Sequence, residues 1–320
     1  MTPADRPTVW FFGVTTAQSS IMRVFPEWAR HLGLGDVAMR GIDLVPHDRP
    51  ARYREVVAFL KSDPLSLGAL VTTHKLDLFA AARDMFDEID PHAQLMEETS
   101  CLSKRAGRLV CHAKDPISSG LALDGFLPES HFAQTGAEVF SMGAGGSTIA
   151  LTWHLAQAAR AGDRPSRILV SNRSQARLEH LAAIHARLGH GIPVECILAP
   201  RPQDNDAVLA RLKPGALVIN ATGLGKDAPG SPLTDAARFP DRAIAWDLNY
   251  RGDLVFLDQA RAQAAARSLQ VEDGWTYFIH GWTQVIAEVF DIAIPVRGPA
   301  FDEIAAIAAR VTGRAPAHAD

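Results

Sequence analysis

A cluster of glycines near the middle of the chain has the spacing of a phosphate-binding turn. Residues 138–150 read Glu-Val-Phe-Ser-Met-Gly-Ala-Gly-Gly-Ser-Thr-Ile-Ala, so an apolar run ends in glycines and a helix-forming segment follows. Glycines let the backbone turn sharply and approach a pyrophosphate, and the helix N-terminus offers free N–H groups. The pattern predicts the start of a dinucleotide-binding unit. The alternative is a plain tight turn between a strand and a helix.

A second candidate phosphate site follows one strand later. Residues 167–171, Arg-Ile-Leu-Val-Ser, are predicted to form the next strand, which ends in Asn172, Arg173 and Ser174, with Arg177 just beyond. In dinucleotide-binding folds an acidic residue at this strand tip selects NAD, whereas an arginine accommodates the 2′-phosphate of NADP. No acidic residue stands at this tip, so we expect NADP as the cofactor. The alternative is an ordinary solvated loop.

Two charged residues in the first half of the chain could transfer a proton. Lys75 directly follows a predicted buried strand, and partial burial would lower its pKa toward neutrality, which suits acid–base catalysis. Asp115 follows a predicted hairpin, and its carboxylate could orient the lysine and keep it charged. We expect both residues to face a cleft between two domains, although solvated loop charges are the alternative. The acidic pair Glu97 and Glu98 is interpreted as a solvated turn rather than as catalytic carboxylates.

Alternating apolar segments predict the scaffold that would hold these residues. Strand-like and helix-like segments follow one another along most of the chain, which is typical of a mostly parallel sheet with helices on both faces. Besides the run before the glycines, the predicted strands are residues 8–13, 41–45, 67–73, 100–103, 108–112, 167–171, 194–199, 216–220, 243–247 and 269–273. The predicted helices are residues 21–32, 49–61, 80–88, 176–188, 204–212, 258–267, 276–291 and 301–311.

The predicted fold class is α/β, with two domains. Residues 1–117 would form an αβα substrate-binding and catalytic domain with a mostly parallel sheet, and residues 118–274 a Rossmann-type NADP-binding domain. The helices in residues 275–312 would return to pack on the first domain. Residues 313–320 are predicted to be a disordered tail.

Composition narrows the class of protein. The chain has 320 residues, is 47% hydrophobic and 21% charged, and has a net charge of −4, so no basic excess points to nucleic acid or to a membrane surface. No run is long enough to span a membrane, and no apolar signal region opens the chain. The 3 cysteines are irregularly spaced and the 12 histidines have no ligand spacing, which predicts a reducing cytoplasm and no metal site.

The same segments resemble the shikimate/quinate dehydrogenase family over nearly the whole chain. Residues 69–75 match the family's Asn-Val-Thr-x-Pro-x-Lys motif and keep Lys75, and residues 111–115 match its Gly-x-Asn-Thr-Asp motif and keep Asp115. The family's Gly-Ala-Gly-Gly-Ala/Ser, Asn-Arg-Thr, Asn-Ala-Thr-Ser-x-Gly and Asp-x-x-Tyr motifs are matched at residues 143–147, 172–174, 220–225 and 247–250, and its late glycine at Gly274.

The resemblance implies roles for the matched residues. Lys75 and Asp115 would be catalytic. The NADP-binding residues would be Gly143, Ala144, Gly145, Gly146, Ser147, Asn172, Arg173, Ser174, Arg177, Asn220, Ala221, Thr222, Gly223 and Gly274.

Departures from the family gather at the expected substrate pocket. Ala69 and Val71 replace an asparagine and a threonine, Ser100 replaces the asparagine of the family's Ala-Val-Asn-Thr segment, and Gly281 replaces a glutamine. A pocket that hydrogen-bonds a polyol is sensitive to such losses, because buried hydroxyls then go unpaired. The residues expected to bind the substrate are Gln18, Ser20, Val71, Ser100, Tyr250 and Gln284.

These observations predict an NADP(H)-dependent oxidoreductase that interconverts an alcohol and a ketone on a small, hydroxylated, cyclic acid that is similar to shikimate but is not shikimate itself. One alternative is an authentic shikimate or quinate dehydrogenase with an atypical pocket. Another is a catalytically silent NADP-binding regulator, but that protein would need neither Lys75 nor Asp115. The expected partner is the small hydroxy acid, with no nucleic acid and no membrane, and a homodimer is left open.

Overall fold

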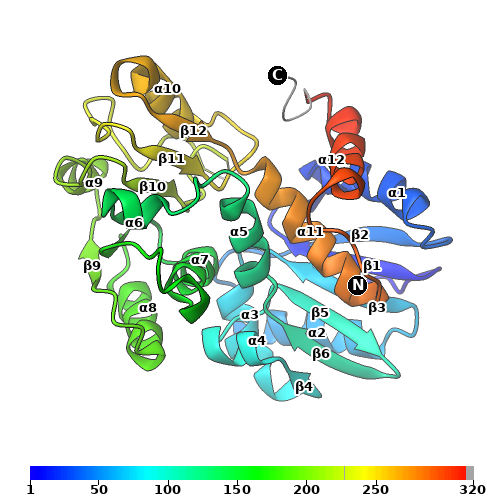
Figure 1. The fold of residues 1–320 in the computed structure, drawn as a ribbon. Helices are drawn as coiled ribbons and strands as arrows, with labels where there is room; N and C mark the ends of the chain where they lie inside the picture. Colours follow the sequence, from blue (N-terminus) through cyan, green and yellow to red (C-terminus); the bar gives the residue numbers. More distant parts are fainter. Residues whose placement is uncertain (227, 315–320) are drawn as a thin grey trace. The chain divides into compact units, whose positions relative to one another are not determined.

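The computed structural model describes residues 1–226 and 228–314. The chain folds into two compact units. The first unit combines residues 1–118 with the C-terminal part of the chain from residue 279, and the second unit comprises residues 119–278. The chain leaves the first unit within helix α5 (Asp115–Asp124) and re-enters it within helix α11 (Trp275–Phe290). Figure 1 labels both helices. Part of the predicted tail, residues 315–320, lies outside the described residues.

A mixed sheet forms the centre of the first unit. In the described residues its six strands lie in the order β2-β1-β3-β5-β6-β4. The β1–β2, β1–β3 and β4–β6 pairs are parallel, whereas β5 runs antiparallel to both β3 and β6. The strands are β1 (Thr8–Gly13), β2 (Ala38–Asp43), β3 (Ser66–Val71), β4 (Glu88–Ile89), β5 (Cys101–Arg105) and β6 (Arg108–His112).

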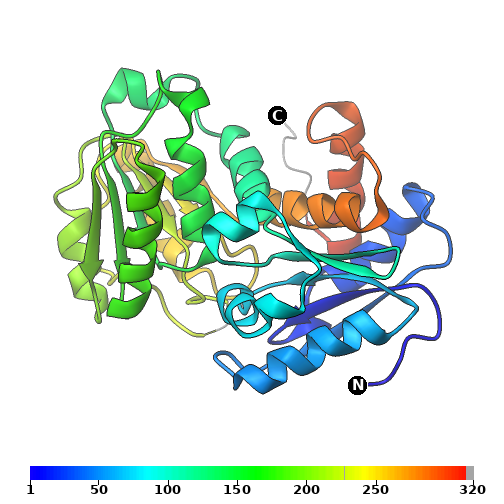
Figure 2. The same ribbon diagram turned by 90° about the horizontal axis from the view of Figure 1, so that it is seen from below.

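Helices cover both faces of this sheet because β1 is apolar on both sides. Trp10 and Phe12 point into a core shared with α2 (Pro50–Ser62) and α3 (Lys75–Ala82), and Figure 2 shows α2 along that face. Phe11, which alternates with them, points the other way and packs edge-on against Trp282 of α11, with ring centroids 5.1 Å apart. Short helical segments complete the unit: η1 (Thr16–Gln18), η2 (Arg83–Met85) and α4 (Pro91–Met96).

The C-terminal helix belongs to the first unit. Helix α12 (Pro299–Thr312) packs on α1 (Ile21–His31), and the indole N–H of Trp28 donates a buried hydrogen bond of 2.9 Å to the Ile304 carbonyl. His280 of α11 stacks on Phe301 with ring centroids 4.5 Å apart. Aromatic anchors therefore join the last two helices to the N-terminal part of the chain.

The second unit has a fully parallel sheet in the described residues. Its strand order is β12-β11-β10-β7-β8-β9, which, renumbered within the unit, is the 6-5-4-1-2-3 order of a Rossmann fold. The order reverses between β7 and β10, so the carboxyl ends of these two strands flank the crevice where such folds bind ligands. The strands are β7 (Val139–Met142), β8 (Ile168–Asn172), β9 (Val194–Leu198), β10 (Leu217–Asn220), β11 (Ile244–Asp247) and β12 (Gln270–Glu272).

Helices also line the sheet of the second unit. One apolar cluster joins Phe140 and Val218 of the sheet to side chains of α9 (Pro202–Leu209) and α10 (Val255–Arg267). The remaining helical segments are α6 (His131–Thr135), α7 (Gly146–Ala156), η3 (Ala158–Arg160) and α8 (Gln175–Leu188).

The two-domain α/β fold predicted from the sequence is confirmed, with local differences. The helix expected at residues 80–88 instead begins at Lys75 and ends at Ala82, and the prediction missed strand β4. The prediction also missed helix α5, which follows the hairpin. Across the described residues, no helix is both long and apolar enough to cross a membrane.

Candidate active site

Lys75 and Asp115, which lie 40 residues apart in sequence, form an ion pair in the first unit. The Lys75 ammonium donates to a carboxylate oxygen of Asp115, and the two side chains are only 13% and 8% exposed. The alternative of separate, solvated loop charges is therefore wrong. Lys75 follows strand β3 and Asp115 follows the β5–β6 hairpin, and each residue is also the first of a helix, α3 or α5.

These helix ends affect the two charges in opposite ways. The N-terminus of a helix has a positive partial charge, which favours the Asp115 carboxylate at the start of α5 and disfavours the Lys75 ammonium at the start of α3. Nearby anions must therefore offset the unfavourable position of the lysine. Asp115 is one such anion.

Backbone hydrogen bonds tie the pair to the sheet. The Val71 N–H donates to the Ser100 carbonyl (3.0 Å), and the Thr99 N–H donates to the Lys75 carbonyl (3.2 Å). The Ser100 hydroxyl accepts from the backbone N–H groups of Lys114 (2.6 Å) and Asp115 (3.3 Å), so it caps the start of α5. The last residue of β3 and the residues that precede β5 thus fix the backbone positions of Lys75 and Asp115.

The predicted substrate-binding residues have different surroundings. In the first unit, Gln18 is exposed, whereas Ser20 and Gln284 are half-buried, and the described residues show no hydrogen bond to either of these two side chains. Val71 has no exposed surface and packs in the apolar core, and the Ser100 hydroxyl is occupied as a cap. Val71 therefore contributes to the core and Ser100 fixes the start of α5. Contact of either residue with a substrate stays a prediction.

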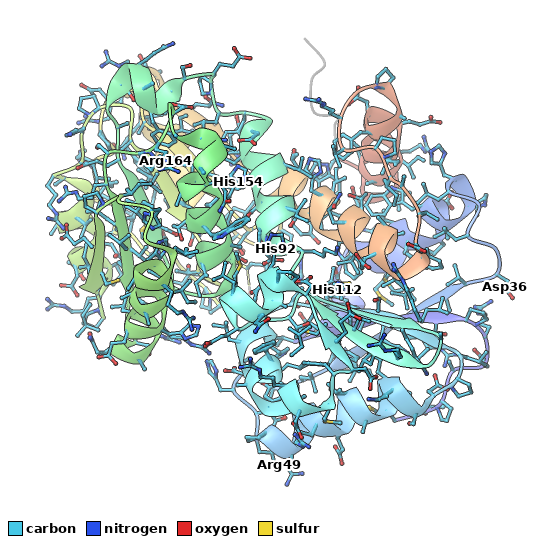
Figure 3. The ribbon with its side chains drawn as sticks, turned by 60° about the horizontal axis from the view of Figure 1, so that its bottom comes forward. Asp36, Arg49, His92, His112, His154 and Arg164 are labelled. Atoms are coloured by element: carbon cyan, nitrogen blue, oxygen red, sulfur yellow. The ribbon has the colours of Figure 1, made fainter. Side chains whose placement is uncertain are left out.

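Two histidines flank the ion pair in sequence, and both have partners within the protein. His74 is fully buried, its Nδ1 lies 3.2 Å from the Tyr53 hydroxyl, and burial lowers its pKa. His112 of β6, labelled in Figure 3, hydrogen-bonds Ser103 at 2.8 Å and lies 3.3 Å from an Asp90 oxygen. These contacts anchor the surroundings of Lys75 and Asp115.

The glycine loop of the second unit joins β7 to α7. Gly143 has φ 108°, and a Cβ there would lie 2.6 Å from the Ala221 carbonyl oxygen, so this position requires glycine. Gly145 is the N-cap of α7 and has an extended backbone, and a Cβ there would meet no heavy atom within 4 Å. The protein itself does not require glycine at position 145. The open space there fits a phosphate group at the helix N-terminus.

Arg173 is the free charge at the tip of β8. Asn172 accepts a 2.8 Å bond from the Ser174 N–H, and the Ser174 hydroxyl caps α8 at the Arg177 N–H. Arg173 is exposed, and within the described ranges its guanidinium has no ion pair or hydrogen bond. It is therefore available to a 2′-phosphate, whereas Arg177 is half-buried and already has an interaction partner.

Hydrogen bonds of two buried polar side chains, Asn220 and Asp247, fix the loop after β10. Asn220 donates to Asp247 (3.0 Å) and accepts from the Thr222 N–H (3.0 Å), while Asp247 accepts from the Asn249 N–H (2.8 Å). Burial, the dominant effect, raises the pKa of Asp247 to about 6. Ala221 bonds back to the Met142 carbonyl (2.8 Å), so this loop and the glycine loop are joined.

Gly274 and a group of aromatic residues complete the second unit's predicted site. A Cβ on Gly274 would lie 2.1 Å from the Leu248 carbonyl oxygen, so two backbone segments meet there at a distance that only glycine allows. Tyr250 packs on Phe278 with ring centroids 4.4 Å apart, and the Tyr277 hydroxyl donates to the Ser147 hydroxyl at 3.2 Å. The first turn of α7 is therefore linked to α11.

Comparisons with known proteins identify relatives along the chain. It is 29% identical over 189 residues to a shikimate dehydrogenase (NADP(+)) of Lactococcus lactis subsp. cremoris, which covers 59% of this chain and 61% of that enzyme. It is 26% identical over 288 residues to the shikimate dehydrogenase (NADP(+)) of Methylocella silvestris, with 90% and 91% covered. No family model matches. The chain is therefore similar to shikimate dehydrogenases over most of its length, at an identity below 30%.

Solved structures show the same fold. The shikimate 5-dehydrogenase of Thermus thermophilus, in complex with NADP(H) and shikimate, has a TM-score of 0.67 at 22% identity, covering 95% of this chain and 99% of that one. A 5-ketofructose reductase of Gluconobacter, in its ligand-free form, has a TM-score of 0.65 at 18% identity, with 96% and 98% covered. The fold of the shikimate dehydrogenases therefore also occurs in a protein named for a different substrate.

One residue of the site contradicts the sequence interpretation. Glu98 was expected in a solvated turn, but it is fully buried, and neither carboxylate oxygen has a hydrogen-bond partner among the described residues. Burial, followed by the negative charge of Asp115, raises its pKa to about 8. A sequence signal did exist, because Glu98 stands at the alanine of the family's Ala-Val-Asn-Thr segment, three residues before the start of β5.

Proposed function

We propose that this chain is an NADP(H)-dependent dehydrogenase or reductase that interconverts a secondary alcohol and a ketone on a small, hydroxylated acid. The observation that carries the proposal is the Lys75–Asp115 ion pair, a nearly buried ammonium and carboxylate at the positions that match the family's lysine and aspartate. A protein that only sensed NADP would have no use for a buried proton-transfer pair. Kinship with enzymes named NADP-dependent shikimate dehydrogenases supports the same conclusion.

The second unit has features that suit the cofactor. The space beside Gly145 and the N-terminus of α7 would hold the pyrophosphate, and the free guanidinium of Arg173 would hold the 2′-phosphate. The Asn220–Thr222 loop, fastened to Asp247, would lie beside the nicotinamide. When bound, NADP+ supplies the hydride acceptor for alcohol oxidation.

Lys75 would carry out the proton transfer. In oxidation its neutral amine removes the hydroxyl proton of the alcohol, and in reduction its ammonium gives a proton to the carbonyl oxygen. Asp115 holds the Lys75 side chain in place and stabilises the ammonium form, and its second oxygen would accept from a hydroxyl of the substrate. One positioned group of this kind typically contributes a factor of about 10²–10⁴ to the rate.

We further propose that the natural substrate is not shikimate. Val71, which replaces the family's threonine, is fully buried and offers no hydroxyl, and Ala69, which replaces its asparagine, is also fully buried. Loss of such groups removes hydrogen bonds that a polyol needs. An authentic shikimate or quinate dehydrogenase remains the alternative. The proposed cellular location is the cytoplasm, in keeping with three free cysteines in the described residues, and a homodimer stays an untested prediction.

A substrate screen tests the proposal. The purified protein would be incubated with NADP+ or NAD+ and a panel of cyclic and linear hydroxy acids that includes shikimate and quinate, and with NADPH and the matching ketones. We expect NADP(H)-dependent turnover of at least one member and weak turnover of shikimate. The variant Lys75→Ala, measured beside it, should lose that turnover.

Two other results would change the assignment. Robust shikimate oxidation would support the authentic shikimate dehydrogenase alternative. NADP+ binding in calorimetry, without turnover of any compound in either direction, would support the silent regulator.

A further inference from the structure

Glu98 is close enough to the Lys75–Asp115 pair to interact with both charges. The sequence predicts a solvated turn for this residue. Glu98 follows helix α4, where its N–H donates to the Ala93 carbonyl (3.3 Å), and the next residue, Thr99, bonds the Lys75 carbonyl (3.2 Å). Its side chain has no exposed surface and no hydrogen-bond partner among the described residues. Burying a carboxyl group without partners is costly, so the position calls for an explanation.

Four titratable groups interact electrostatically with Glu98, from three helical segments and one strand. They are Lys75 of α3, Asp115 of α5, Asp90 at the N-cap of α4 and Cys111 of β6. The Asp90 carboxylate is already occupied, since it accepts from the Ala93 N–H (2.7 Å) and the Ala113 N–H (3.2 Å). Burial keeps the Cys111 thiol neutral by raising its pKa to about 12. Lys75 is the only member of these four that can carry a positive charge beside the Glu98 carboxylate.

Two features of its position disfavour the ammonium form of Lys75. It stands at the N-terminal end of α3, where the helix dipole opposes a cation, and its side chain is mostly removed from water. A second carboxylate nearby would favour the charged lysine, and the attraction is stronger in a buried site than in water. The alanine of the family motif could not provide this interaction.

We propose that Glu98 is a positioning residue that acts through Lys75: its carboxylate keeps Lys75 in the ammonium form to higher pH, which favours the ketone-reducing direction. The inference rests on the proposed function. In that direction a hydride adds to the carbonyl carbon, the carbonyl oxygen takes a proton from the Lys75 ammonium, and the resulting neutral amine takes a proton from solvent. Because the pKa of Glu98 is raised to about 8, its carboxylate forms as the solution becomes alkaline. In that pH range a partly buried lysine would otherwise begin to lose its proton.

Competitive acylation measures the charge of Lys75 without any substrate. Trace acetic anhydride reacts only with the neutral amine, so mass spectrometry across a pH series gives the pH at which Lys75 is half reactive. We expect Glu98→Gln to lower this midpoint by about one pH unit, the lower end of the effect of a nearby opposite charge. The matched control is Glu97→Gln, which removes the same charge from the neighbouring half-buried residue and should leave the midpoint where it is.

Kinetics give the second readout. For any ketone that the screen identifies, the alkaline limb of the kcat profile for reduction should move to lower pH in Glu98→Gln by the same amount, and Glu98→Asp should restore part of it. A merely structural role would change kcat or stability without moving that limb. If Glu98→Gln does not fold, Glu98→Ala, which installs the family's residue, takes its place in both experiments.

The outcomes separate the two proposals. An unchanged Lys75 midpoint in a folded Glu98 variant would overturn the inference, whatever the enzyme turns over. A lowered midpoint, in a protein that neither oxidises nor reduces any compound of the screen, would support the action of Glu98 on Lys75 while the proposed function fails.

Discussion

The two units of this molecule build their sites in different ways. In the second unit, backbone geometry defines the site: Gly143 has a left-handed φ, Gly274 lies against a carbonyl, and Asn220 fastens a loop through hydrogen bonds. In the first unit the candidate site consists of charged side chains: the Lys75–Asp115 ion pair and the buried Glu98, which interacts with both electrostatically. The family pattern is kept where backbone geometry requires glycine, and it is altered at Ala69, Val71 and Ser100, in the pocket that is expected to bind the substrate.

The largest expected effect is on the proton-transfer pair. Lys75→Ala should lower turnover by about two to four orders of magnitude, because it removes the general acid–base group, while NADP+ binding measured by calorimetry survives. Asp115→Asn should act in the same direction. The double variant should be little worse than Lys75→Ala alone, since the two residues act as one unit. Full additivity of the two changes would show that the ion pair is not a functional unit.

The next effect concerns stability, and its sign follows from the pKa of Glu98. The folded protein raises this pKa from its usual value near 4.5 to about 8, so between these two pH values the folded state binds more protons than the unfolded state. The contribution of Glu98 to the free energy of unfolding should therefore fall as pH rises from about 4.5 to about 8. Glu98→Gln cannot ionise, so its stability relative to the natural protein should increase over this range by a few kcal/mol, since one pKa unit corresponds to about 1.4 kcal/mol. Urea unfolding at pH 5 and pH 9 measures the change, and a constant difference between the two proteins would contradict it.

Two glycine variants distinguish a glycine that the backbone conformation requires from a glycine that only the ligand would require. Gly143→Ala should destabilise the protein by about 1–3 kcal/mol, because its φ is positive and its Cβ would collide with Ala221. Gly145→Ala meets neither obstacle, so it should retain the melting temperature and lose NADP+ affinity only. Thermal melts with and without NADP+ distinguish the two, and equal melting temperatures for both apoproteins would count against this description of the loop.

The smallest expected effect is on cofactor choice. Arg173→Ala removes the free guanidinium at the tip of β8, and a charge-assisted phosphate contact is worth about 1.5–3 kcal/mol. The preference for NADP+ over NAD+ should therefore fall by about ten-fold or more, with NAD+ affinity nearly unchanged as the internal control. Equal loss for both cofactors would assign Arg173 to another part of the dinucleotide or to folding.

Much of the fold could be predicted from the sequence, because the signals that specify it are local. The glycine loop, the alternation of strands and helices and the two-domain α/β class were read from short segments, and the structure has them. Errors occurred where local patterns are weak. Helix α3 begins at Lys75 rather than at residue 80, and two-residue strand β4 has too few side chains to show a period.

The sequence by itself determined the glycine loop and the late glycine, because a Cβ at Gly143 or Gly274 would collide with a neighbouring backbone carbonyl. It also contained both members of the charged pair. Only the tertiary structure decided that Lys75 and Asp115 meet, that Ser100 caps a helix, and that Glu98 lies without partners inside the protein. Burial and charge pairing depend on which distant segments pack around a side chain. A motif of five residues does not contain that information.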